Sequence, residues 1–202
     1  MTYTVIGSVP TRTARVLWLL EELGQAYTHL PARPRSDEAL RANPSGKVPA
    51  LVVAKASESV TLTDSTAILT FLADRHGQFT YPAGSVERAR QDGYLMLVLD
   101  EIEGLLWAAS RHSFILPEAM RLPALKPVLI WEYERHIERL AAALTGPFLM
   151  GEQMTVPDIV LAHCLRWASV AKFPAPAPVL ADYLARMTAR PAFTRAMARG
   201  NP

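Results

Sequence analysis

The sequence predicts a chain with two parts, an α/β part followed by an all-α part. Up to residue 77, short runs with strand character alternate with segments of helical periodicity. Beyond that point nearly every segment has helical periodicity, and Tyr81-Pro82-Ala83-Gly84 has the composition of a linker. We therefore expect an α/β domain over 1–77, a linker over 78–84 and an all-helical domain over 85–202.

The first part begins with a β-α-β unit. Its expected elements are a strand over 3–6, an amphipathic helix over 12–23 that ends at Gly24, and a strand over 27–30. The elements expected after it are a short helix over 36–42, strands over 48–53 and 59–62 around a turn at 54–58, and a helix over 64–75. The order β-α-β-α-β-β-α is that of the thioredoxin-like fold, here without a Cys-x-x-Cys motif.

The second part reads as a succession of helices separated by prolines. The expected helices cover 85–110, 118–144, 155–171, 179–188 and 192–199. Pro127 falls inside the second of these and is expected to kink or split it, whereas Pro157 is tolerable in a first helical turn. Thr155-Val156-Pro157-Asp158 has the spacing of a capping box, which we assign to folding and not to chemistry.

Composition and charge exclude several function classes. The chain has 202 residues, of which 50% are hydrophobic, enough for one large core or two smaller ones. Its formal charge is only +2 and its basic residues are dispersed among acidic ones, so we expect no nucleic-acid surface. The N-terminus is too short and too polar for a secretion signal, and no apolar run approaches a membrane span. We expect a soluble cytoplasmic protein with no membrane partner.

Cysteine and histidine usage argues against a metal site. The single cysteine, Cys164, excludes an internal disulfide and any multi-cysteine metal site. It lies in a run of helical periodicity, where cysteine commonly behaves as a small buried hydrophobe. The five histidines have no metal-ligand spacing, so we expect no metal.

Two short segments are spaced to form one binding site, which we call the clamp. The first segment contains Val48-Pro49. A cis bond there would turn the Val48 N–H and C=O toward solvent, where an extended peptide could pair with them as an added strand. The alternative is a trans proline at the start of a strand, which is the more frequent isomer.

The second segment of the clamp is Asp64-Ser65, at the start of the helix expected over 64–75. Unpaired backbone N–H groups at a helix N-terminus, together with the Ser65 hydroxyl, could bind a ligand carboxylate, and Asp64 could bind an ammonium group. The alternative is ordinary helix capping by Thr63, Asp64 or Ser65.

The stretch Asn43-Pro44-Ser45-Gly46-Lys47-Val48-Pro49-Ala50-Leu51, followed by Asp64-Ser65-Thr66-Ala67-Ile68, resembles the glutathione-binding half of a cytosolic glutathione transferase. Residues 8–24, 149–159 and 186–193 are similar to three further stretches of that family, in the expected order. The resemblance implies the glutathione transferase fold, a thioredoxin-like domain followed by a helical one. It also implies glutathione as cosubstrate, a homodimer, and glutathione-binding roles for Lys47, Val48, Pro49, Asp64 and Ser65. Lys47 could instead simply face water.

The reaction of this family requires a sulfur nucleophile at neutral pH. A free thiol has a pKa of roughly 8.5, and a hydroxyl that donates a hydrogen bond to the thiolate favours the charged form. The candidates are Ser8, Thr11 and Thr13, between the first strand and the first helix. The spacing of Ser8 from Arg15 resembles that of the catalytic serine in zeta-like and tau-like members, and Thr11 resembles the hydroxyl used in other classes. The alternative is that all three merely cap the helix.

The second substrate is expected at an apolar wall of the helical domain that contains Trp107, His112 and Phe114. The alternative is that this aromatic stripe is core. The resemblance therefore implies an enzyme of detoxification that adds glutathione to a hydrophobic electrophile by transfer of an alkyl or aryl group. Glutathione-dependent peroxide reduction, disulfide reduction or isomerisation at the same site, and a non-catalytic binding protein of the same fold, remain alternatives.

Overall fold

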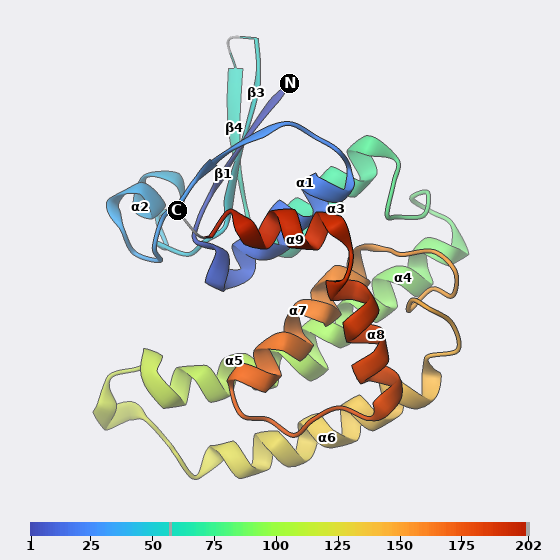
Figure 1. Ribbon diagram of the computed structural model, residues 1–202. Helices are drawn as coiled ribbons and strands as arrows, with labels where there is room; N and C mark the ends of the chain where they lie inside the picture. Colours follow the sequence, from blue (N-terminus) through green and yellow to red (C-terminus); the bar gives the residue numbers. More distant parts are fainter. Residues whose placement is uncertain (57, 201–202) are drawn as a thin grey trace. The chain divides into compact units, whose positions relative to one another are not determined.

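The computed structural model describes residues 1–56 and 58–200 (Figure 1). The chain forms two compact units. The first contains residues 1–80 together with the segment from Thr188 onward, and the second contains Tyr81–Met187. Among the residues described, no helix combines the length and the apolar character that crossing a bilayer requires.

The first unit contains a mixed four-stranded sheet. The strands are β1 (Thr2–Ile6), β2 (Tyr27–Leu30), β3 (Ala50–Lys55) and β4 (Glu58–Thr63), in the order β2-β1-β3-β4. β1 runs parallel to β2, and β3 runs antiparallel to both β1 and β4. This arrangement confirms the thioredoxin-like architecture predicted from the order of elements.

In the described part of the first unit, the sheet is accompanied by the α-helices α1 (Ala14–Glu22), α2 (Asp37–Ala42), α3 (Ser65–His76) and α9 (Pro191–Ala198). α1 packs against both α3 and α9. The core lies where α1 and α3 bury their apolar side chains. Its fully buried members include Val5, Val16, Leu17, Leu20, Ile68, Leu69 and Leu72.

Two elements of the first unit start two residues later than the sequence predicts. α1 begins at Ala14 and not at residue 12, because Thr11 is extended (φ −134°, ψ −174°) and residues 9–13 form an irregular turn, η1 (Val9–Thr13). β3 begins at Ala50 and not at residue 48. Pro49 has no N–H to donate to a strand ladder, so pairing starts after it.

The second unit is all-helical, as predicted. Its elements are α4 (Val86–Leu97), η2 (Val98–Glu103), α5 (Gly104–Ser110), η3 (Arg111–Ile115), η4 (Glu118–Met120), α6 (Leu125–Ala143), α7 (Val156–Val170) and α8 (Pro178–Thr188). The helix expected over 118–144 is split into η4 and α6. Pro127 lies in the first turn of α6, where its missing N–H would have no helical partner.

α7 is the most buried helix described in this unit, and it packs against α4, η2 and α5. The predicted capping box is confirmed at its start, where the Thr155 N–H donates to Asp158 Oδ2 at 2.8 Å. Asp158 also accepts from the Leu149 N–H and the Tyr183 hydroxyl, both at 2.9 Å to Oδ1. Cys164 is fully buried on this helix, which confirms its reading as a core residue.

The last helix packs with the first unit. α9 lies against α1, with the Trp18 and Phe193 rings edge to face at 4.9 Å between centroids. By packing, residues from Thr188 onward therefore group with the α/β part, whereas the sequence places 85–202 in one helical domain. The boundaries at 77 and 84 stay a prediction.

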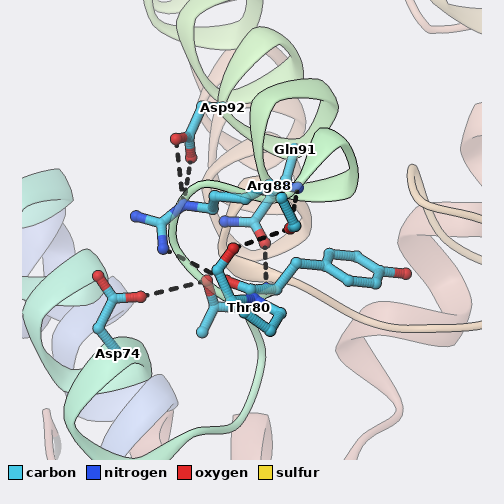
Figure 2. Close-up of polar contacts among 8 residues, drawn as sticks. Asp74, Thr80, Arg88, Gln91 and Asp92 are labelled. Carbon is cyan, nitrogen blue, oxygen red and sulfur yellow. Dashed lines mark hydrogen bonds and ion pairs between the residues drawn. The ribbon is translucent and has the colours of Figure 1, made fainter.

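Hydrogen bonds hold the chain on each side of the boundary between the two units, which lies between Thr80 and Tyr81 (Figure 2). In the first unit, the Thr80 hydroxyl donates to Asp74 at 3.4 Å. In the second, Arg88 Nε donates to both oxygens of Asp92 at 2.9 and 3.1 Å, and Gln91 accepts from the Tyr81 N–H at 3.0 Å. The segment expected to be a linker is thus tied to both units by local contacts.

Candidate functional site

One end of the sheet in the first unit brings three segments of the chain together. Ala50 of β3 pairs with Ile6 of β1 on one side and with Thr63 of β4 on the other. The next residues beyond this row are Gly7, Pro49 and Asp64. The Ser8 loop (residues 8–13) and both segments of the clamp therefore start from neighbouring strand ends.

Gly7 marks the closest approach of two of these segments. Its φ is +146°, and a Cβ at this position would lie 2.1 Å from Thr13 Oγ1 and 3.0 Å from Val48 Cβ. Its N–H donates to the Leu30 carbonyl at 3.0 Å. Only glycine suits both this backbone conformation and this space, so Gly7 brings the Ser8 loop next to Val48.

The two threonine hydroxyls of the Ser8 loop bond within the loop. The Thr11 hydroxyl donates to the Ser8 carbonyl at 2.6 Å, and its oxygen lies 2.9 Å from Thr13 Oγ1. The Thr13 N–H donates to Thr11 Oγ1 at 3.1 Å. The Thr11 hydroxyl has one proton for two acceptors within the loop, the Ser8 carbonyl and the hydroxyl oxygen of the fully buried Thr13, so it donates to one of them at a time.

Ser8 differs from both threonines. It is extended (φ −94°, ψ 143°) and half-buried, and its side chain makes no capping hydrogen bond to η1. The helix-capping alternative therefore does not describe Ser8, and its hydroxyl keeps a proton for another acceptor.

The first segment of the clamp has a cis Val48-Pro49 bond, which settles the isomer that the sequence left open. Val48 is half-buried, Pro49 is buried and Lys47 is exposed. The preceding loop is fixed by the Asn43 side-chain amide, which donates to the Lys47 carbonyl at 3.0 Å. Gly46, with φ +66°, accepts from the Arg35 N–H at 2.8 Å.

The second segment of the clamp begins with Asp64, which caps α3. Its Oδ1 accepts from the Thr66 N–H at 2.8 Å and from the Ala67 N–H at 3.1 Å. Capping by Asp64, one of the sequence alternatives, is therefore present. Both bonds use one oxygen, so the second carboxylate oxygen of this exposed side chain is left for a cation. Its backbone conformation (φ +69°, ψ 123°) lies outside the left-handed helical region that aspartate tolerates at positive φ, and such conformations cluster at functional sites.

Ser65 connects the clamp to a buried cation that sequence reasoning missed. Its hydroxyl accepts from Arg15 Nη1 at 3.3 Å, and the exposed fractions of the two residues are only 2% and 1%. Arg15 lies on α1, so its guanidinium adds positive potential beside the N-terminus of α3. One feature of the sequence could have indicated the burial of Arg15. It lies inside the apolar run Ala14–Leu20, where a charged side chain must be buried with a partner.

The residues proposed for the second substrate all lie in the second unit. Trp107 is partly buried and packs edge to face with Trp167 at 6.5 Å between centroids. His112 accepts from the Leu122 N–H at 3.2 Å and borders a groove with Arg121 and Leu129, whereas Phe114 is 68% exposed. The groove is bordered by His112 but by neither of the other two aromatic residues.

Comparisons of the sequence with known families match both parts of the chain. The model of the glutathione S-transferase N-terminal domain matches residues 12–75, and that of the C-terminal domain matches residues 131–191. The chain is 27% identical over 159 residues to glutathione S-transferase GstA of Escherichia coli O157:H7, covering 77% of this chain and 74% of that protein.

Solved structures show the same fold over almost the whole chain. A glutathione transferase from Methylococcus capsulatus is similar with a TM-score of 0.84 and 25% identity, over 98% of each chain. A glutathione transferase family member from Pseudomonas fluorescens, solved with two glutathione molecules bound, has a TM-score of 0.81 and 24% identity over 97% of this chain and 92% of that one.

Proposed function

Because the chain belongs to the glutathione transferase family, we propose that it binds glutathione and adds its sulfur to a hydrophobic electrophile. One observation carries the proposal. The Ser8 loop, Val48-Pro49 and Asp64-Ser65 start from three adjacent strand ends, aligned on the pairing of Ala50 with Ile6 and Thr63. A peptide and its thiol can therefore meet all three segments at once.

The clamp binds the peptide part of glutathione. The extended tripeptide pairs with the N–H and C=O of Val48 beside Pro49, as one more antiparallel strand. The γ-glutamyl carboxylate lies at the N-terminus of α3 and accepts from the Ser65 hydroxyl, which itself accepts from Arg15. The second oxygen of Asp64 binds the ammonium group, and Lys47 contributes positive charge from the exposed loop.

Ser8 acts on the sulfur. The Ser8 hydroxyl donates a hydrogen bond to the glutathione thiolate, which favours the charged form and lowers the pKa of the bound thiol. The thiol proton leaves to solvent, and the sulfur lone pair forms a bond to the electrophilic carbon. The leaving group departs with the electron pair of the broken bond, so no external oxidant or reductant is required.

Thr11 supports Ser8 in this scheme. Its proton is donated within the loop, to the Ser8 carbonyl at 2.6 Å or to Thr13 Oγ1 at 2.9 Å, so the same proton is not available to a thiolate. Thr11 then fixes the backbone from which the Ser8 side chain projects. The same thiolate could also serve peroxide reduction, disulfide reduction or isomerisation. The role of Trp107, His112 and Phe114 toward the second substrate stays a prediction from the sequence.

The experiment compares turnover and binding in matched variants. Ser8→Ala is expected to lower kcat for conjugation of a chloronitroarene about 100-fold, the lower range for loss of one catalytic hydrogen-bonding group. The dissociation constant for glutathione, measured by calorimetry, should change less than about threefold because the clamp is intact. Thr11→Ser should retain most activity, since its hydroxyl can still donate to Ser8.

Ser59→Ala, at an exposed position of β4, is the control. Unchanged turnover in Ser8→Ala, with a large loss in Thr11→Val that Thr11→Ser does not show, would assign the sulfur to Thr11. Binding of glutathione without conjugation of any electrophile would favour the non-catalytic alternative. Failure to bind glutathione at all would refute the proposed site.

A further inference from the structure

The Ser8 loop is contacted from outside by the segment that follows α9. A Cβ on Gly200 would lie 2.8 Å from Val9 Cβ and 3.1 Å from both Val9 Cγ atoms. A separation below 3.0 Å is closer than carbon atoms tolerate, and the Cβ of Val9 cannot rotate away. The absence of a side chain at Gly200 is therefore what permits this segment to lie against the residue next to Ser8.

The segment that carries Gly200 is fixed on α1 by several polar contacts. Arg190 donates to both carboxylate oxygens of Glu22, at 2.5 and 2.8 Å. The Trp18 ring N–H also donates to Glu22, at 2.9 Å, and Arg195 donates to Glu21 at 2.7 Å. With the Trp18 ring packed on Phe193, these contacts define the place of α9 on the same helix that follows the Ser8 loop.

The Ser8 loop is therefore held in two ways. Within this part of the chain, the Thr11 hydroxyl donates to the Ser8 carbonyl, and the buried Thr13 lies close to Gly7. From the far end of the sequence, Gly200 contacts Val9. A hydrogen bond to a thiolate depends steeply on distance and angle, and misplacement of a donor by about 1 Å can cost on the order of 100-fold in rate.

We propose that Gly200 is a positioning residue for Ser8. Because Gly200 has no side chain, the segment after α9 can contact Val9, and this contact fixes the position of the Ser8 hydroxyl relative to the glutathione sulfur. The inference rests on the proposed function, in which Ser8 donates to that sulfur. The clamp residues Val48, Asp64 and Ser65 make no part of this contact, so the consequence falls on the chemistry and not on peptide binding.

The test substitutes Gly200→Ala in the full chain. The added methyl group displaces Val9, so the amide resonances of Ser8 and Val9 in the unliganded protein should move. The thiolate absorbance of bound glutathione at neutral pH should fall, and kcat should drop about 5- to 20-fold while KM for glutathione changes less than about twofold. Gly93→Ala is the control, because a Cβ at this exposed helical position would meet nothing within 4 Å.

A second variant separates positioning from a loss of folding. Val9→Gly removes the Cβ that the new methyl group would meet. In the Val9→Gly background, the change in log kcat caused by Gly200→Ala should therefore be at most about half of the change in the wild-type background. Unmoved Ser8 and Val9 resonances, or moved resonances with a wild-type thiolate signal, would overturn the positioning role alone. A wild-type protein that shows no thiolate signal would overturn the proposed function, and the positioning role with it.

Discussion

Gly7 shows how one residue without a side chain determines the site. Two factors exclude any other residue at this position. Its φ is +146°, and a Cβ would lie only 2.1 Å from Thr13 Oγ1. We expect Gly7→Ala to destabilise the protein by about 3 kcal/mol or more in denaturant unfolding, because strain and overlap add. Gly24→Ala separates the two effects, since Gly24 has φ +62° and nothing within 4 Å. It should cost only about 1 kcal/mol, and an equal loss in the two variants would show that overlap at Gly7 is unimportant.

Ser65 links ligand binding to stability through Arg15. Ser65→Ala removes the acceptor of Arg15 Nη1 and the donor proposed for the glutathione carboxylate. We expect glutathione affinity, measured by calorimetry, to fall about 10- to 100-fold and the free energy of unfolding to fall by about 1–3 kcal/mol. The exposed Ser59→Ala again serves as the comparison. Wild-type affinity in Ser65→Ala would contradict the role given to this hydroxyl.

At the scale of elements, we expect the contact between α1 and α9 to depend on pH through Glu21. Burial alone would raise the pKa of Glu21, but hydrogen bonds from Arg195 and Tyr27 outweigh it and hold the pKa below 4.5. On Tyr27, burial and the bond to Glu21 raise the pKa to about 12. A pKa lowered by folding adds stability above about pH 4.5 that is lost as pH falls through the folded-state pKa.

We therefore expect Glu21→Gln to lower the free energy of unfolding by about 1 kcal/mol at pH 7, since the pair is only partly shielded from solvent. The difference from wild type should shrink as the pH falls below about 4.5. Urea titrations at a series of pH values measure this, with the exposed Glu58→Gln as control. A difference that grows toward low pH would contradict the sign of the shift.

Element boundaries were predictable where the determining chemistry is local. Thr155 and Asp158 form the capping box that their spacing indicates, and Asp64 caps α3, because these bonds join residues within one turn. The start of α1 was not predictable although the contacts of the extended Thr11 to Ser8 and Thr13 are also local, because all three hydroxyl residues could cap the helix and their spacing does not say which of them stays outside it. These contacts in turn depend on the approach of Thr13 to Gly7.

Residues whose roles depend on distant partners were harder to predict. The burial of Arg15 depends on Ser65, which is remote in sequence, and only its place in an apolar run pointed to it. Periodicity indicates that α9 has an apolar face, but it does not say that this face meets Trp18 on α1. The two segments of the clamp were predictable from the sequence. That they lie beside the Ser8 loop follows only from the strand register, which the sequence does not reveal.

At the scale of the whole molecule, the chain combines an α/β unit that contains all three segments of the proposed site with a helical unit that contains the proposed electrophile wall. Within the first unit, the chain returns at Thr188 so that its last helix covers α1. Residues near both ends of the sequence, Val9 and Gly200, therefore meet beside the proposed catalytic hydroxyl.

The most direct test of the central claim is a pH titration of the ultraviolet thiolate absorbance of glutathione bound to the wild-type protein and to Ser8→Ala. If Ser8 donates to the sulfur, the bound thiol has a pKa at least about one unit below that of free glutathione. Removal of the hydroxyl then raises this pKa by about one to two units, the equivalent of one hydrogen bond to a charged group. Superimposable titration curves for the two proteins would contradict the account.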